Sequence, residues 1–487
     1  MKRNDRTFVL FLLTLVYGFN FIDRQIVGIL APWIQADLDL TNTQLGLLVG
    51  LAFAAFYTIM GIPLAFLADR MNRVTLLSLA LAVWSGFTAL TGFAQNFVHI
   101  ALARVGVGIG EAGGSPPSHS MISDFYSREE RAGALGIYSL GIPFGIMSAY
   151  FLTAALMGAD ADAVNWRRIF VILGIAGIAL AVFVKCVVRE PERGAMEAGV
   201  SSGYISLRQS LATPGLPLHI LVFGGLFSLL TGLWLTGYIS WVFALPFIIF
   251  IVVMFLLSLQ PGVMTILSIK SWWWMAFGIA FASFFGYAMA GFQTKYLGLL
   301  DPDFPPRTFI IWIGIINGTF YVAGAYFGAK LVDWKAGTDI RAYGTLPALS
   351  VLAAFPLAIA AFLVPTVELH LIVSAAMQLC LGVYLGPSFA IAQTLAPVKL
   401  RAMSTALFFF VLNMIALGGG PTFAGAMIDV FLGAGNTELG AVQLAMYVTA
   451  GACLLSFASY MLVRQTLPKD WATAEARNRV GMTGTRA

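Results

Sequence analysis

The sequence predicts an all-α integral membrane protein with fourteen transmembrane helices, arranged as two six-helix bundles with pseudo-two-fold symmetry plus an inserted two-helix hairpin. Of its 487 residues, 59% are hydrophobic and only 10% are charged, whereas about a quarter of the residues in a soluble domain are charged. The mean hydropathy is +0.86, and long apolar stretches recur along the whole chain. A fold surrounded by water could not bury so many apolar side chains, so lipid is the expected solvent.

Each of the fourteen apolar stretches is long enough to cross a bilayer as a helix of about 20 residues. Their approximate limits are 8–32, 43–68, 75–94, 97–121, 132–157, 167–188, 216–236, 239–259, 271–292, 307–331, 346–364, 369–393, 403–430 and 440–463. The first stretch is too long for a signal peptide and no small-residue cleavage site follows it, so we expect it to be retained.

A polar segment near the middle of the chain separates two sets of six spans. We expect an N-terminal bundle at 1–190, a cytoplasmic linker at 191–215, an inserted transmembrane hairpin at 216–260, a C-terminal bundle at 261–465 and a cytoplasmic tail at 466–487. The loops after the second and tenth spans are weakly similar, with Asp69 matching Asp333. Two parallel halves with a site at their interface are typical of secondary transporters.

Basic residues predict the orientation of the spans. With the N-terminus placed in the cytoplasm, 22 of the 28 Lys and Arg residues fall in cytoplasmic segments, 4 in the opposite segments and 2 inside spans. This asymmetry follows the positive-inside rule and places both termini in the cytoplasm. The net charge of +5 therefore reflects membrane topology, and we expect no nucleic-acid partner.

Four charged residues lie inside predicted spans. Asp23 and Arg24 are in the first span, and Arg104 and Glu111 share one face of the fourth, since seven residues are nearly two helical turns. Each charge at the bilayer centre costs about 2.5–3.5 kcal/mol on insertion scales, so the four must either pair or face a wet cavity. One interpretation is a set of structural ion pairs, and the other is a substrate-facing cluster in which a carboxylate exchanges a proton.

Other chemistries have no matching pattern in the sequence. There is no P-loop motif, and the four histidines do not have the spacing of metal ligands. The three cysteines lie in apolar runs, which favours packing over bridges or zinc. We therefore expect no metal, no cofactor and no enzymatic activity, and we regard a lipid enzyme or a channel as the less favoured class.

Several motifs resemble a known family. The pattern GxxxAxLADRxxR at Gly61–Arg73 is similar to motif A of the major facilitator superfamily, and RVGVGIGEAG at Arg104–Gly113 is similar to its fourth-helix motif. The first span, with FNFIDRQIVGIL, and the fourth, with the run ending in SMISDFY, resemble the Spinster branch of sphingolipid and lysolipid transporters. The superfamily resemblance covers nearly the whole chain except the hairpin, and the Spinster resemblance is strongest in the first half.

The resemblance implies roles for individual residues. Asp23, Arg24, Arg104 and Glu111 would serve head-group binding and proton coupling. The residues of a cytoplasmic gate would be Asp69, Arg70, Arg73, Arg131 and Asp333, with Asp69 pairing with Arg131 and facing the helix that begins near Ser404. Further polar residues that could line the cavity, or else make interhelical hydrogen bonds, are Asn20, Tyr57, Thr58, Tyr138, Gln378, Tyr384 and Asn413.

The expected function is secondary active transport by alternating access within a major facilitator fold. The substrate would be an amphipathic lipid such as a lysolipid or sphingoid phosphate, coupled to protons, and the alternative is a proton-coupled drug or organic-anion transporter. The charges concentrate in the first half, which suits a molecule with one charged end. We expect a monomer, in contact with membrane lipids, in a bacterial inner membrane.

Overall fold

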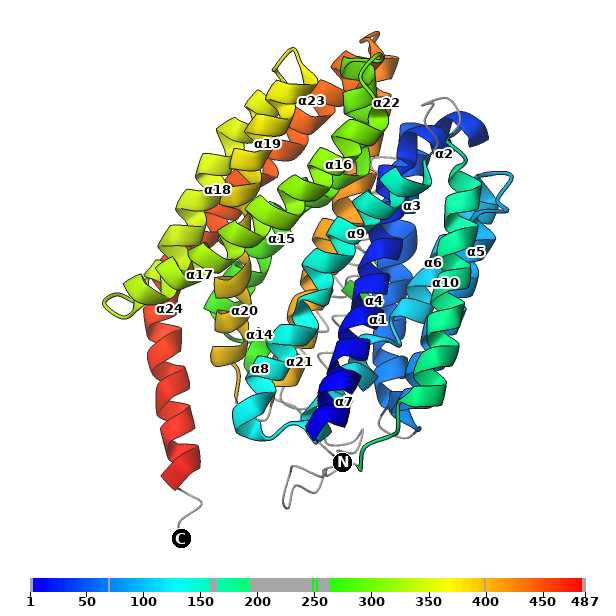
Figure 1. Cartoon of the computed structure of the whole chain (residues 1–487). Helices are drawn as coiled ribbons and strands as arrows, with labels where there is room; N and C mark the ends of the chain where they lie inside the picture. The colour runs from blue at the N-terminus through cyan, green and yellow to red at the C-terminus, as the bar shows by residue number, and fades with distance from the viewer. Residues whose placement is uncertain are drawn as a thin grey trace. The chain divides into compact units, whose positions relative to one another are not determined.

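The computed structural model of the chain describes residues 3–68, 71–157, 164–192, 248, 251–252, 263–397 and 400–483. These residues form helices, and none of them belongs to a strand (Figure 1). Eleven helical stretches in this part of the chain are long and apolar enough to cross a membrane. The predicted all-α membrane class is confirmed. The predicted hairpin, apart from residues 248 and 251–252, and the linker beyond residue 192 lie outside the described residues.

The predicted fourth span is not one continuous helix. It consists of α6 (Phe97–Glu111) and α7 (Ser115–Phe125), and the residues from Ala112 to Gly114 between them are not helical. Gly114 precedes α7 without a side-chain cap, and prolines occupy its first turn, where the missing amide hydrogens have no helical partner to lose. The break therefore directly follows Glu111.

The chain divides into two compact units, which are described separately. Unit 1 comprises residues 1–202, 290–318 and 425–442. Its helices, besides α6 and α7, are α1 (Arg3–Ile29), α2 (Ala31–Leu38), α3 (Asn42–Val49), α4 (Leu51–Ala68), α5 (Arg73–Thr91), α8 (Arg128–Ser139), α9 (Gly141–Leu156), α10 (Trp166–Val187) and α16 (Pro306–Ile316). It also contains the ends of α15 (Lys270–Leu300) and α22 (Gly420–Gly433), and the start of α23 (Glu438–Ala450).

Glycines allow α1 and α9 to pack closely inside unit 1. A Cβ atom at Gly141 would lie 2.7 Å from the Thr14 carbonyl oxygen, and one at Gly145 would collide with the Gly18 carbonyl oxygen. Because these obstacles are backbone atoms, a side chain could be accommodated only by separating the helices. Small residues at helix contacts are the usual means of close packing in membranes.

Unit 2 comprises residues 203–289, 319–424 and 443–487. Besides parts of α15, α22 and α23, its described helices are α14 (Val263–Leu267), α17 (Val322–Ala336), α18 (Ala342–Ala361), α19 (Val367–Gly382), α20 (Leu385–Thr394), α21 (Arg401–Leu412) and α24 (Ala452–Thr483). Two π-helical segments, η2 (Asn317–Tyr321) and η4 (Asn413–Gly419), interrupt the spans that contain them. Since both units contain parts of the predicted C-terminal bundle, the predicted domain boundaries stay a prediction.

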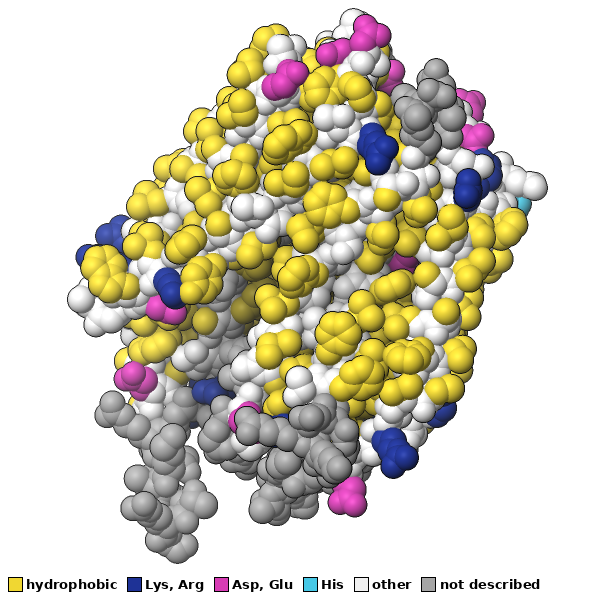
Figure 2. Space-filling model, in the orientation of Figure 1, with side chains coloured by type: hydrophobic (Ala, Val, Ile, Leu, Met, Phe, Trp, Pro, Cys, Tyr) yellow, Lys and Arg dark blue, Asp and Glu magenta, His cyan; other side chains and the backbone are white. Residues whose placement is uncertain are grey.

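The outer surface of the helices is apolar, as contact with lipid requires. On α10, Ile175 and Val182 are each 60% exposed, and on α19 Ile372 is 65% exposed. Figure 2 shows hydrophobic side chains over most of the face in view. Exposing so large an apolar surface to water is unfavourable. These residues therefore identify the sides of the helices that face the hydrocarbon of the membrane.

Candidate functional site

The four charged residues predicted inside spans are brought together by α1 and α6. Arg24 Nε donates a hydrogen bond to Glu111 Oε2 at 2.8 Å. The Glu111 side chain has no exposed area and that of Arg24 is 9% exposed, while Asp23 and Arg104 are also buried. The seven-residue spacing predicted a shared face for Arg104 and Glu111, but the direct partner of Glu111 comes from α1.

The ion pair between Arg24 and Glu111 is only partly satisfied. Arg24 Nη2 and Glu111 Oε1 are both buried and make no hydrogen bond of good geometry among the described residues, although Tyr57 lies close to Arg24 and Asn20 lies close to Glu111. A buried polar atom without a partner costs about 1–3 kcal/mol, and more when the group is charged. The arrangement therefore keeps one donor and one acceptor available beside an intact charge pair, which is what a site for a proton or a polar ligand group requires.

Three aromatic rings surround the guanidinium group of Arg24. Its Cζ atom lies 4.4 Å from the ring centre of Tyr57, 4.9 Å from that of Phe21 and 5.0 Å from that of Phe53. Distances below about 6 Å to the ring face are favourable for a cation. The rings stabilise a charged Arg24 in an apolar environment, and Phe53 is also 5.0 Å from Arg104 Cζ.

Arg104 contacts backbone oxygens rather than a carboxylate. Its Nε donates to the Leu48 carbonyl and its Nη1 to the Asp23 carbonyl, each at 3.3 Å. It also interacts electrostatically with the carboxyl groups of Asp23 and Glu111. The long bonds to α3 and α1 leave this cation weakly tethered in a buried position, within reach of both acids.

A small recess adjoins the cluster at the break in the fourth span. Residues from α1, α5, α8, the break and the start of α7 line it, namely Val16, Tyr17, Asn20, Trp84, Gly114, Ser115 and Tyr138. Asn20 Oδ1 and Trp84 Nε1 are buried and make no hydrogen bond of good geometry among the described residues, but Asn20 lies close to Glu111 and Trp84 lies close to Asp23. Two of the residues predicted to line a cavity, Asn20 and Tyr138, thus lie beside the break.

Of the other residues predicted to line a cavity, some belong to unit 1 and some to unit 2. In unit 1, Tyr57 contacts Arg24, whereas the Thr58 hydroxyl donates to the Ala54 carbonyl of its own helix at 2.6 Å. In unit 2, the Tyr384 hydroxyl lies 3.0 Å from Ser283 Oγ. Gln378 and Asn413 are buried, and Asn413 is the first residue of a π-helical segment.

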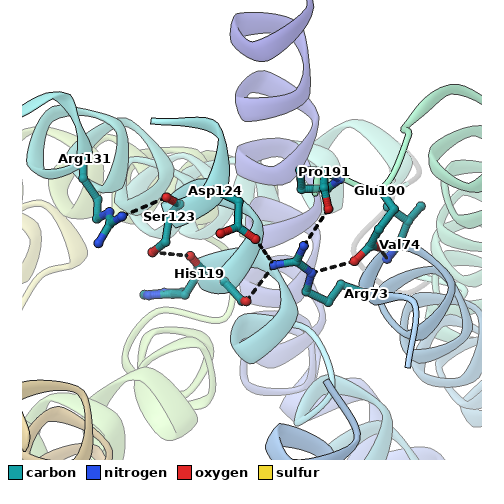
Figure 3. Close-up of polar contacts among 9 residues, drawn as sticks. Arg73, Val74, His119, Ser123, Asp124, Arg131, Glu190 and Pro191 are labelled. Carbon is teal, nitrogen blue, oxygen red and sulfur yellow. Dashed lines mark hydrogen bonds and ion pairs between the residues drawn. The ribbon is translucent and has the colours of Figure 1, made fainter. Parts of the chain in front are cut away.

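Arg73 is the centre of a polar network at the start of α5 (Figure 3). It forms ion pairs with Asp124 at 2.5 Å and Glu190 at 2.6 Å, and it also donates to Ser120 Oγ and the Pro191 carbonyl. The sequence indicated Arg73 but did not indicate its partners Asp124 and Glu190. The network fastens α5 to α7 and to the chain that leaves α10.

Two other gate candidates have contacts of their own among the described residues. Arg131 Nη2 donates to the Ser123 carbonyl at 2.8 Å, and Asp333 accepts a hydrogen bond from the Tyr343 hydroxyl at 2.7 Å in unit 2. Asp69 and Arg70 lie outside the described residues. The predicted pair of Asp69 with Arg131 therefore stays a prediction.

No group of three or more His, Cys, Asp or Glu side chains among the described residues could hold a metal ion. Cys186, Cys380 and Cys453 are all free thiols.

Comparisons with known proteins agree with this architecture. Residues 13–332 match the family profile of the Major Facilitator Superfamily. An MFS-type efflux pump of Mycolicibacterium smegmatis is 28% identical to the chain, over 93% of this chain and 89% of its own length. The Spinster protein of Drosophila melanogaster is 30% identical over 39% of this chain, which is 31% of its own length.

A solved structure covers almost the whole chain. It is the crystal structure of a bacterial homologue of the human lysosomal transporter Spinster, in an inward-facing and occupied conformation. It matches with a TM-score of 0.75 and 26% identity, over 96% of this chain and 99% of that chain. The resemblance to Spinster transporters and the major facilitator fold predicted from the sequence are confirmed.

Proposed function

The chain belongs to the Major Facilitator Superfamily, and we propose that it works by alternating access as a proton-coupled transporter of an amphipathic, lipid-like molecule. A lysolipid or a sphingoid phosphate has the required chemistry, since each joins a charged head group to one apolar tail. The proposal rests on the buried pair of Arg24 and Glu111, in which each side chain keeps one polar atom without a partner.

The two cations of the cluster are suited to an anionic head group. A phosphate accepts hydrogen bonds from a guanidinium group readily, and these bonds are stronger than those between neutral groups. Arg24 Nη2 is the available donor, and Arg104 has only long bonds to carbonyl oxygens. The aromatic rings around Arg24 would keep it charged while its anionic partner changes.

The two acids are suited to proton coupling. When a head group takes Arg24 as its partner, Glu111 would be left as an uncompensated buried carboxylate, which costs several kcal/mol. Protonation of Glu111 removes that cost, and departure of the head group restores the original pair. Asp23, beside Arg104, is the second acid that could take part in this exchange.

The distribution of buried charge supports an amphipathic substrate. Buried polar residues in the described part of unit 2 include Ser283, Gln378 and Asn413, but no Asp, Glu, Lys or Arg. The charged cluster belongs to unit 1 alone. A molecule with a charge at only one end needs ionic partners on only one side.

The membrane setting follows from the same proposal. We assign the protein to a bacterial inner membrane as a monomer with both termini in the cytoplasm, in accordance with its basic loops. Arg73, Arg131 and Asp333 would then lie near the cytoplasmic side, together with Asp69 and Arg70, as parts of a gate.

A second candidate is a proton-coupled drug or organic-anion transporter. The similarity to an efflux pump over 93% of the chain favours this alternative. The same cluster would serve it, because a buried guanidinium binds carboxylates as well as phosphates.

Flux measurements distinguish the two candidates. Purified protein in proteoliposomes under a pH gradient should move a labelled lysolipid, with a proton signal from an internal dye. Excess drugs or organic anions should compete weakly. Strong competition by a drug, without lysolipid flux, favours the second candidate. Absence of any proton signal during saturable flux contradicts proton coupling in both.

A further inference from the structure

An exposed lysine lies inside a membrane span of unit 2. Lys330 is on α17, six residues before the end of the apolar stretch Pro306–Ala336, which corresponds to about 9 Å along the helix axis. Its Nζ atom lies 4.4 Å from the ring centre of Tyr326, one turn further from that end. Within the described part of the chain, no carboxylate pairs with Lys330. Because a charge within a span normally has an ionic partner, this lysine calls for an anion.

The side of α17 next to Lys330 is strongly apolar. Phe327, Leu331 and Trp334 follow at spacings of four and three residues, which places them on one helix face, and they are 64%, 48% and 73% exposed. Tryptophan favours the boundary between hydrocarbon and head groups, and Trp334 lies two residues before the apolar stretch ends. Lys330, four residues earlier, is therefore about 6 Å on the hydrocarbon side of Trp334.

Three further cations lie at this end of α17. Lys335 and Arg341 flank the turn that leads to α18, and both are exposed. Arg464, also exposed, comes from α24, since a Cβ atom at Gly344 would lie 2.5 Å from the Arg464 backbone nitrogen. These three side chains also have no ion-pair partner among the residues that the structure describes. Figure 2 shows Lys and Arg side chains among hydrophobic ones at the left edge of the view, where α17 ends in Figure 1.

The two acids of the turn already have partners within the protein. Asp333 accepts a hydrogen bond from the Tyr343 hydroxyl at 2.7 Å, and Asp339 accepts one from the backbone amide of Arg341 at 3.0 Å. Tyr343 in turn stacks on Trp471 of α24, with the ring centres 6.3 Å apart. The anion that the cations require is thus not supplied by the described part of unit 2.

We propose that this end of α17 binds the head group of an anionic phospholipid with two acyl chains, such as phosphatidylglycerol. The residues of this α17 lipid site are Phe327, Lys330, Trp334, Lys335, Arg341 and Arg464. Basic side chains next to a membrane span attract anionic lipids, and the exposed apolar face of α17 provides a surface for the acyl chains.

The position of Lys330 favours an anionic lipid over other anions. A small hydrated anion gains nothing from the exposed rings of Phe327 and Trp334, whereas a phospholipid brings a phosphate and apolar chains together. A zwitterionic lipid also carries a phosphate, but its own ammonium group would meet Lys335 and Arg341. A head group with net negative charge has no such repulsion.

The α17 lipid site is separate from the charged cluster around Arg24 and Glu111. All its residues belong to unit 2, whereas those of the cluster belong to unit 1. It therefore does not depend on the proposed function, and a protein that moves any substrate could hold such a lipid.

Native mass spectrometry of the purified full-length protein in detergent tests the site. The parent chain is titrated with phosphatidylglycerol, with phosphatidylcholine and with inorganic phosphate, and the same titrations are made with Lys330→Gln and Lys330→Arg. The matched control is Lys469→Gln, which removes the same charge from an exposed lysine of α24 outside the site.

We expect the parent to bind phosphatidylglycerol at least tenfold more tightly than phosphatidylcholine. Lys330→Gln should weaken this binding about fivefold, the contribution of one basic residue at an anionic membrane surface. Lys330→Arg and Lys469→Gln should bind like the parent, and inorganic phosphate should not displace the lipid.

Several results would overturn the proposal. They are equal affinity for the two lipids, unchanged binding of phosphatidylglycerol by Lys330→Gln, an equal loss in Lys469→Gln, and displacement of the lipid by phosphate. If Lys330→Gln does not fold, the double variant of Lys335→Gln and Arg341→Gln decides, because both positions lie in the exposed turn. Weaker binding of phosphatidylglycerol by this variant supports the site, and unchanged binding overturns it.

Discussion

Under the proposed function, replacement of Glu111 by glutamine should separate proton coupling from substrate movement. Glutamine keeps an oxygen that can accept from Arg24 Nε, now at 2.8 Å, but it carries no charge and takes up no proton. Removing one member of a buried ion pair costs about 3–5 kcal/mol. Because one hydrogen bond is retained, we expect a loss of about 2 kcal/mol in the free energy of unfolding, which a folded protein can tolerate.

The effect on transport can be calculated from the proton gradient. One pH unit corresponds to about 1.4 kcal/mol per proton, so coupling to one proton sustains a concentration difference of about tenfold at equilibrium. The parent chain should approach this value in proteoliposomes. Glu111→Gln should fall to no accumulation, while exchange of labelled for unlabelled substrate continues, since exchange needs no net proton movement.

A matched control uses an acid outside the cluster. Glu130 pairs with Arg6 at 2.8 Å, and its side chain is 44% exposed. An exposed pair contributes little to stability, so Glu130→Gln should accumulate substrate like the parent. Tenfold accumulation by folded Glu111→Gln would refute the assignment of the coupling proton to this residue.

Three further predictions concern packing and electrostatics. Arg73→Lys cannot reproduce the ion pairs with both Asp124 and Glu190, and we expect a loss of about 2–4 kcal/mol; an unchanged melting temperature in detergent would contradict this. Gly145→Val should lower the yield of monodisperse protein in size-exclusion chromatography, because its side chain would meet the α1 backbone; a normal yield would show that the helices can separate. Tyr57→Leu should weaken substrate binding in thermal-shift titrations about fivefold through loss of the ring beside Arg24, whereas Tyr57→Phe should bind like the parent; equal weakening by both would implicate the hydroxyl instead.

Much of the architecture could be predicted because lipid imposes simple rules on sequence. Apolar length predicted the spans, and the cost of charge in a membrane indicated Asp23, Arg24, Arg104 and Glu111. Because a charge inside the membrane is costly unless it has a partner or faces water, the four residues were also expected to lie together. The partner of Glu111 could not be predicted, because the distance between α1 and α6 and the break after Glu111 depend on packing throughout unit 1.

The polar ends of the spans were much harder to interpret. Lys295, Asp429 and Glu438 lie where charged residues are common in any membrane protein, so their residue types carry no signal. Lys295 and Asp429 have partners between positions 35 and 43, and Glu438 pairs with Lys295, so no local pattern connects segments so far apart. Asp124 and Glu190, the partners of Arg73, were missed for the same reason.

The interruption between α6 and α7 divides the fourth span into two helices that meet at a break. A continuous helix resists bending because each turn is bonded to the next, whereas these two pieces share few such bonds. Glu111 is the last helical residue of the first piece. A change in the charge of Glu111 would therefore act directly at the break between the two helices.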